Sequence, residues 1–197
     1  NGTIGATIGH GLSSAPEMMI FKNRSGSGQW NVYHSSLGNT KYMLLDTANA
    51  QATSTWLTNT NPSNSLFTLS NFGDTNASAS TYIAYCFNSV EGYSKFGSYT
   101  GNGSADGTFV YTGFRPAWLL IKNTTTAGYY WCLLDNRRSP YNTEWQRLYP
   151  NDELAEDTGQ GNWDVDAVSN GFKLRGLNQN QNQSGSNYIY MAFAENP

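Results

Sequence analysis

Apolar residues occur along the chain in short runs that alternate with polar, glycine-containing segments. Residues 18–21 and 118–121 each form a four-residue apolar run that closes on Lys-Asn. Runs of this length are too short for a helix and are typical of a buried strand. A turn containing glycine and a segment containing tryptophan follow each run, which predicts a β-hairpin in both halves. Only residues 152–157 (DELAED) suit a helical turn, so the pattern predicts an all-β chain.

The same pattern recurs with a period near 100 residues. Five segments of the first half return in the same order: residues 1–3 and 102–104, 15–23 and 115–123, 30–33 and 131–134, 67–69 and 172–174, and 81–87 and 187–193. The separation between matched residues grows slowly along the chain, as insertions in loops would make it. We therefore infer an internal duplication, with a first β repeat in residues 1–95 and a second in residues 96–197.

Each repeat is expected to form a β-sandwich or a jelly-roll-like unit. Many short strands with regular turn signals are typical of these folds and of barrels. Two arrangements remain open, namely two tandem sandwiches or one pseudo-symmetric sandwich to which both halves contribute. We favour repeats packed closely together, because residues 93–110 between them alternate aromatic residues with glycines. That connecting segment reads as strand, turn and strand, which is unlike a flexible linker.

The composition argues against a helical protein, a nucleic-acid-binding protein and a membrane-inserted protein. Gly, Ser, Thr and Asn together make up 82 of the 197 residues, a composition that favours turns and strands over helices. Charged residues are only 13% and the net charge is −3, so there is no basic footprint for nucleic acid. No run approaches 18 apolar residues, so we expect no membrane insertion.

Few residues suit metal binding or catalysis. Cys86 and Cys132 lie in apolar runs, where we expect buried free thiols, with a single disulfide as the alternative. His10 and His34 are the only histidines, and no cysteine or histidine stands at metal-ligand spacing, so we expect no zinc site and no cofactor. The chain has no Gly-x-Ser-x-Gly motif, and we expect no catalytic residues.

Acidic residues of the second half leave an enzymatic alternative open. Asp164 and Asp166 stand two apart in an expected strand, so both would face one side. Glycoside hydrolysis requires two such carboxyl groups. The alternative function is therefore a jelly-roll carbohydrate-active protein, either a binding module or a polysaccharide depolymerase. We interpret the acidic residues in 152–157 as a solvated edge, with a calcium site as the alternative.

The tryptophans fall into two groups. Trp30 and Trp131 occupy matching repeat positions in apolar segments and are expected in the core. Trp56, Trp145 and Trp163 have no repeat partner and lie in long polar segments, which are the segments that tend to carry binding residues.

Cationic and aromatic neighbours complete a predicted ligand-binding surface. Arg137 and Arg138 stand shortly before Tyr141 and could bind an anionic sugar or a neighbouring chain. The predicted ligand-binding residues are Arg137, Arg138, Tyr141, Trp145, Trp163 and Trp56. Residues 178–186 (NQNQNQSGS) are of low complexity, and we interpret them as a flexible hairpin tip.

Several motifs resemble a repeated β-rich domain of tailed-phage virion surface proteins, which is tail-fibre-like and of the marine phage type. They are residues 97–104 (GSYTGNGS), 109–116 (FVYTGFRP), 119–122 (LLIK), 169–175 (SNGFKLR) and 190–197 (YMAFAENP). The resemblance covers essentially the whole chain, and it carries over no catalytic residues. It implies a non-enzymatic module on the outside of a virus particle, in a tail fibre or in a decoration or appendage protein.

The resemblance also sets expectations for partners. We expect a role in attachment to the host surface, or in presenting the attachment site, and we expect it to be directed at a glycan. The expected partners are a host cell-surface glycan or other virion proteins, and we expect a homo-oligomer.

Overall fold

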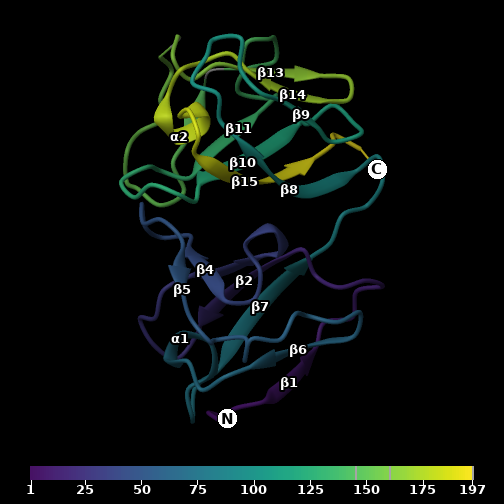
Figure 1. Ribbon diagram of the computed structural model, residues 1–197, viewed down its shortest axis with the longest axis vertical. Coiled ribbons are helices and arrows are strands. Elements are labelled where there is room, and N and C mark those ends of the chain that lie inside the picture. The colour runs from purple at the N-terminus through teal and green to yellow at the C-terminus, as the bar shows by residue number, and fades with distance from the viewer. Residues whose placement is uncertain (145, 160, 197) are drawn as a thin grey trace. The chain divides into compact units, whose positions relative to one another are not determined.

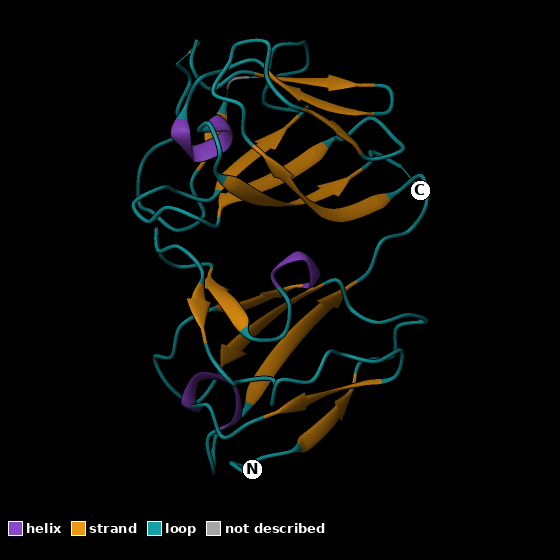
Figure 2. Ribbon diagram, viewed as in Figure 1, coloured by secondary structure: helices purple, strands orange, loops and turns teal. Residues whose placement is uncertain are grey.

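The computed structural model describes residues 1–144, 146–159 and 161–196, and strands and loops dominate it (Figure 1, Figure 2). The all-β prediction is confirmed, and the fold is β-sandwich-like. The chain divides into two compact units. Unit 1 comprises Asn1–Asp46 and Gln51–Asn88, and unit 2 comprises Thr47–Ala50 and Ser89–Pro197.

Unit 1 contains a five-stranded antiparallel sheet and a two-stranded one. The larger sheet has the order β5-β4-β3-β2-β7, with β2 (Met18–Asn23), β3 (Asn31–His34), β4 (Lys41–Leu44), β5 (Ala52–Thr53) and β7 (Tyr82–Phe87). The smaller sheet pairs β1 (Ala6–Gly9) with β6 (Leu66–Leu69). The core lies between them, where Phe21 of β2 meets Phe67 of β6 edge to face at 5.4 Å between ring centroids.

Unit 2 contains a five-stranded and a three-stranded antiparallel sheet. The larger has the order β12-β11-β10-β15-β8, with β8 (Ser94–Thr100), β10 (Trp118–Asn123), β11 (Cys132–Asp135), β12 (Arg147–Leu148) and β15 (Asn187–Phe193). The smaller has the order β13-β14-β9, with β9 (Phe109–Tyr111), β13 (Val165–Val168) and β14 (Gly171–Leu174). Phe172 of β14 and Tyr190 of β15 pack edge to face at 5.4 Å in the core.

The two units use the same strand pairings at matching positions. Met18 pairs with Phe87 in unit 1, and Trp118 pairs with Phe193 in unit 2. The pairing of β2 with β3 corresponds to that of β10 with β11, and the pairing of β1 with β6 corresponds to that of β9 with β14. These registers are the ones that the aligned repeats require. A common origin of the two units by duplication stays a prediction.

The boundary between the units lies after Asn88, earlier than the expected boundary after residue 95. The reason is β8, all seven residues of which pair with β15. Since residues 93–110 contain β8 and the start of β9, which ends at Tyr111, the structure confirms strand, turn and strand there. Residues 152–157, which suited a helical turn, form none.

Residues 178–186 are packed, and the interpretation as a flexible hairpin tip is wrong. They contain the single-turn helix α2 (Gln179–Asn182), which Asn178 caps by accepting a hydrogen bond from the N–H of Asn180 at 2.8 Å. Asn182 is fully buried and donates to the carbonyls of Ser104 at 2.9 Å and Gly176 at 3.0 Å. Low complexity here therefore encodes a hydrogen-bonded turn, since buried amides need partners.

Unit 1 repeats this arrangement without the low-complexity sequence. Its helix α1 (Gly73–Asn76) ends on Asn76, which donates to the carbonyls of Ser70 at 2.8 Å and Thr3 at 3.0 Å. A 3₁₀ turn, η1 (Ser35–Leu37), completes the unit. None of the helices in the described parts of the chain is long and apolar enough to span a bilayer.

The tryptophans are distributed differently from the prediction. Trp131 is 1% exposed, as expected for the core of unit 2. Its counterpart Trp30 is only half-buried, with the Nζ of Lys22 lying 5.5 Å from its ring centroid. The core tryptophan of unit 1 is Trp56, which packs on Phe21 with ring centroids 5.3 Å apart. The expectation that Trp30 is a core residue is therefore wrong.

Candidate functional site

The two predicted arginines lie at the surface of unit 2 and form ion pairs. Arg138 donates from Nε to Asp135 at 2.8 Å and from Nη1 to Glu156 at 2.9 Å, while Arg137 pairs with Glu195. Exposed ion pairs contribute little to stability because water competes for both charges. Breaking one of these ion pairs costs little free energy. Either guanidinium group could therefore release its carboxylate partner and bind an anionic ligand instead.

The predicted aromatic residues do not form one surface. Tyr141 is 79% exposed, whereas Trp163 is half-buried with the guanidinium carbon of Arg147 4.1 Å from its ring centroid. Trp145 lies outside the described residues. Trp56 is 0% exposed, so the prediction that it binds a ligand is wrong, because neither face of its ring is available.

A buried arginine organises the segment that contains Trp163. Arg147 is 1% exposed and donates to Asp157 Oδ2 at 2.7 Å and to the Tyr149 hydroxyl at 3.0 Å. Tyr149 in turn donates to the same Asp157 oxygen at 2.9 Å, and burial raises the pKa of Tyr149 to about 12. The cluster is satisfied internally, so its role is to position this non-repeating segment on the core.

The carboxylates suspected in the enzymatic alternative do not form a free pair. Asp166 is mostly buried and pairs with Arg175 at 2.5 Å, and Asp164 accepts a hydrogen bond from the N–H of Gly161 at 3.1 Å. In the described ranges, no cluster of three or more His, Cys, Asp or Glu side chains could hold a metal ion. Asp164 lies just before β13 (Val165–Val168), and Asp166 lies within β13 and is paired with Arg175, so the two do not form the pair of free carboxyl groups expected on one strand.

Glu144 is the one strongly perturbed carboxyl in this region. It is 3% exposed, and burial raises its pKa to about 7 although Arg115 lowers it. Its Oε1 has no hydrogen-bond partner among the described residues. Because a polymer cannot reach an atom this deeply buried, Glu144 is unsuited to attack or protonate a polysaccharide.

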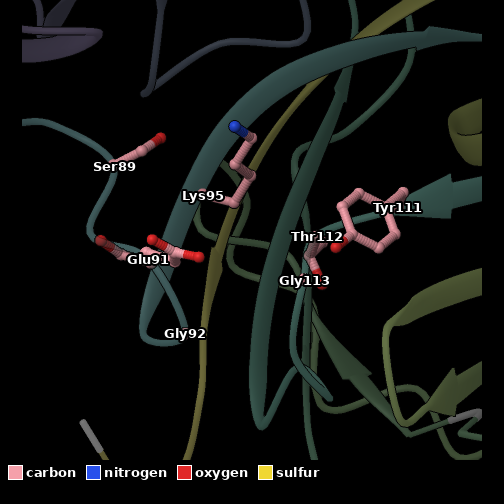
Figure 3. Close-up of a pocket in the computed structure, with 8 residues that line it drawn as sticks. Ser89, Glu91, Gly92, Lys95, Tyr111, Thr112 and Gly113 are labelled. Atoms are coloured by element: carbon pink, nitrogen blue, oxygen red, sulfur yellow. The ribbon is translucent and has the colours of Figure 1, made fainter.

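A polar pocket of about 310 Å³ opens in unit 2 where β8 begins and β9 ends (Figure 3). Its lining residues are Ser89, Glu91, Gly92, Ser94, Lys95, Tyr111, Thr112 and Gly113. Gly92 and Gly113 adopt φ values of +76° and +88°, which glycine tolerates best, so both walls of the pocket depend on glycine turns.

Tyr111 supplies an aromatic face to this pocket. It is 64% exposed, because Phe109 and Tyr111 share the outward face of β9 while Val110 between them points into the core. Glu91 is exposed and Lys95 is half-buried, and neither forms a salt bridge within the described ranges. The pocket therefore offers an aromatic ring, a carboxylate and an ammonium group to a polar ligand.

Sequence reasoning missed this pocket. Residues 93–110 were interpreted as scaffold, and the two lining segments, 89–95 and 111–113, adjoin only in the folded unit. The available signal was the pair of aromatic residues at the alternating positions 109 and 111, which a half-exposed strand would present together.

The chain belongs to the family described as a domain of unknown function, DUF7483, which it matches over residues 1–197. No curated protein and no solved structure gives a significant match to the chain.

Proposed function

We propose that the chain is a non-enzymatic surface module of a tailed-phage virion, located in a tail fibre or in a decoration or appendage protein. It attaches the particle to a host cell-surface glycan or presents the site that does so. The observation that carries the proposal is the open polar pocket, whose lining includes the exposed ring of Tyr111 as well as Glu91 and Lys95. The motifs that resemble phage virion domains support the location.

The chemistry of the pocket suits a saccharide. A volume of about 310 Å³ is at the lower end of the usual range for small-ligand sites and could enclose one sugar ring with part of a second. A tyrosine ring can cover the apolar face of a sugar, while carboxylate and ammonium groups bond to hydroxyls. The side chain of Ser89 adds a hydroxyl group to the lining, whereas the Thr112 hydroxyl is buried and donates to the carbonyl of Phe114.

The surface around Arg137, Arg138 and Tyr141 is the second proposed contact. Its exposed ring and two guanidinium groups could engage an acidic sugar or a neighbouring virion subunit. We expect it to contribute less affinity than the pocket, because both guanidinium groups are already paired with carboxylates.

A glycan array of bacterial and algal polysaccharides, probed with the full chain, tests the proposal. We expect binding to at least one polysaccharide, and a loss of about fivefold for Tyr111→Ala, since an aromatic contact is worth about 1 kcal/mol. Tyr85→Ala in unit 1 is the control, because it removes an exposed tyrosine that lies in neither proposed contact. A larger loss for Tyr141→Ala than for Tyr111→Ala would move the site to residues 137–141.

Two further measurements test the rest of the proposal. Release of reducing sugar from a bound polysaccharide would overturn the non-enzymatic assignment and favour the depolymerase. Labelling of intact particles with an antibody against the chain should mark the virion surface, and sizing of the purified chain should show a homo-oligomer. Absence of the label from particles would overturn the location.

A further inference from the structure

The sheets of the two units differ at one edge. In unit 2, β15 lies between β10 and β8 and pairs with all seven residues of β8. Its counterpart in unit 1 is β7, which pairs with β2 and is the end strand of its sheet in the described part of the chain. Among the described residues no strand pairs with the outer edge of β7, so unit 1 has no equivalent of β8 there, and this edge is of the kind that accepts another strand.

A pocket of about 260 Å³ lies beside this edge. It is lined by Asn1, Ile8, Phe21, Leu69, Thr75, Asn76, Tyr82 and Ala84. Apart from Asn1, these residues come from β1, β2, β6, α1 and β7, so the pocket opens into the core of unit 1. An unfilled space next to an unpaired edge indicates that a side chain is missing from this core.

Unit 2 shows which side chain fills the matching space. Tyr99 of β8 stacks on Tyr188 with ring centroids 4.9 Å apart and an interplanar angle of 9°. It also meets Phe172 edge to face at 5.9 Å, and its hydroxyl donates to the carbonyl of Gln181 at 2.8 Å.

The same surroundings exist in unit 1 without the tyrosine. By the registers of the strands, Tyr188 corresponds to Tyr82, and Gln181 of α2 corresponds to Thr75 of α1. Both Tyr82 and Thr75 line the pocket. The pocket therefore has the surroundings that would bind an aromatic side chain of a strand paired with the edge of β7.

The position of Asn1 indicates how such a strand connects. The amino group of Asn1 lies 3.1 Å from Asn76 Oδ1, and the main-chain nitrogen of Asn102 lies 3.0 Å from Asn182 Oδ1. Asn102 follows β8 after one glycine. A strand attached to the nitrogen of Asn1 would therefore run along β7 as β8 runs along β15, with the turn unchanged.

We propose that the edge of β7 binds an antiparallel strand that places an aromatic side chain in this pocket. In any longer polypeptide that contains these residues, the occupant is the segment joined directly to Asn1. This inference is independent of the proposed glycan binding, because it concerns unit 1 and the completion of its core.

Grafting the missing strand onto the full chain tests the proposal. The residues of β8 and the following glycine, SKFGSYTG, are placed ahead of Asn1, and the control graft SKFGSATG lacks only the tyrosine ring. The readout is alkylation of Cys86, which is half-buried in β7, whereas its counterpart Ala192 under β8 is fully buried. Cys132 is fully buried in unit 2 and serves as the internal control for unfolding of that unit.

We expect the tyrosine graft to slow alkylation of Cys86 at least tenfold and to increase amide exchange protection along β7. The alanine graft should give a much smaller effect, because the pocket stays empty. Equal reactivity of Cys86 in the tyrosine graft and the parent chain would overturn the proposal. Equal protection by both grafts would overturn the role of the pocket.

Two further experiments test whether the strand comes from the segment joined to Asn1, from a separate polypeptide or from a second copy of the chain. The free peptide SKFGSYTG, added to the ungrafted chain, should protect Cys86 only at high concentration, because attachment to Asn1 supplies a large effective concentration. Protection by the free peptide with none from the graft would overturn the connection to Asn1 and assign the edge to a separate polypeptide. Protection of Cys86 in the parent chain that rises with its own concentration would assign the edge to a second copy.

Discussion

Asn182 accepts a hydrogen bond from the main-chain N–H of Asn102, with 3.0 Å between Oδ1 and the nitrogen. It thereby holds the turn at Gly103, where φ is +64° and an added Cβ would lie 2.9 Å from the Cβ of Ser184. One buried amide thus ties α2 to a turn about 80 residues earlier in the chain. Asn76 has the same role in unit 1, where it accepts from the N–H of Gly2 at 3.3 Å.

Replacing this amide should destabilise unit 2 strongly. Asn182→Ala removes the acceptor for Asn102 and the donor for Ser104 and Gly176, and each unsatisfied buried group costs about 1–3 kcal/mol. We expect a loss of about 3 kcal/mol in the free energy of unfolding, measured by urea denaturation. Asn170→Ala, at an exposed asparagine, is the control and should change stability little. Equal midpoints for the two variants would contradict the structural role.

The two tryptophans at matching repeat positions should differ in their contribution to stability. Trp131→Ala should cost about 3–5 kcal/mol, because it empties a fully buried site. Trp30→Ala should cost distinctly less, because that ring is half-buried and covers the surface near Lys22. Thermal melting of both variants checks this order. Equal losses would show that Trp30 contributes to packing as a core residue does.

Glu144 should make the stability of unit 2 depend on pH. Its pKa is raised from 4.5 to about 7, so the unfolded chain releases this proton at lower pH than the folded chain does. The folded state is therefore favoured by this group below pH 4.5 and loses that advantage as the pH rises towards 7. Glu144→Gln, which stays neutral, should match the parent at pH 4 and exceed its stability by about 3 kcal/mol at pH 8.

Urea denaturation at both pH values measures this difference. Glu153→Gln is the control, since Glu153 is exposed. A stability difference between Glu144→Gln and the parent that is the same at pH 4 and pH 8 would show that folding leaves the pKa of Glu144 unchanged, and would contradict its raised pKa.

The two thiols should react at very different rates. Both are free, and the alternative of a disulfide between them is wrong. Burial raises the pKa of Cys132 to about 12, and Cys132 has no exposed surface, so it should react only when unit 2 unfolds. Cys86 is half-buried, and burial raises its pKa too, so it should react slowly in the folded protein. Mass spectrometry after alkylation at pH 8 should find Cys86 modified first, and modification of Cys132 at an equal rate would contradict the burial of unit 2.

The sequence by itself determined several strands and the hairpin that opens each unit. Residues 18–21 and 118–121 were predicted as strands because a four-residue apolar run has no room for a helix, and the structure continues both strands to Asn23 and Asn123. Aligning the repeats also matched Phe87 with Phe193, and the structure pairs these residues with Met18 and Trp118 in the same register. Such local patterns suffice because side-chain alternation and turn residues act within a few positions.

Only the tertiary structure decided which aromatic residues are accessible. Trp56 was predicted at a surface because its neighbours are polar, yet β2 and β6 bring Phe21 and Phe67 around it. The pocket at Tyr111 likewise depends on residues 89–95 lying beside the end of β9. Burial and concavity depend on contacts between segments that are distant in sequence, and neither composition nor periodicity of one segment contains that information.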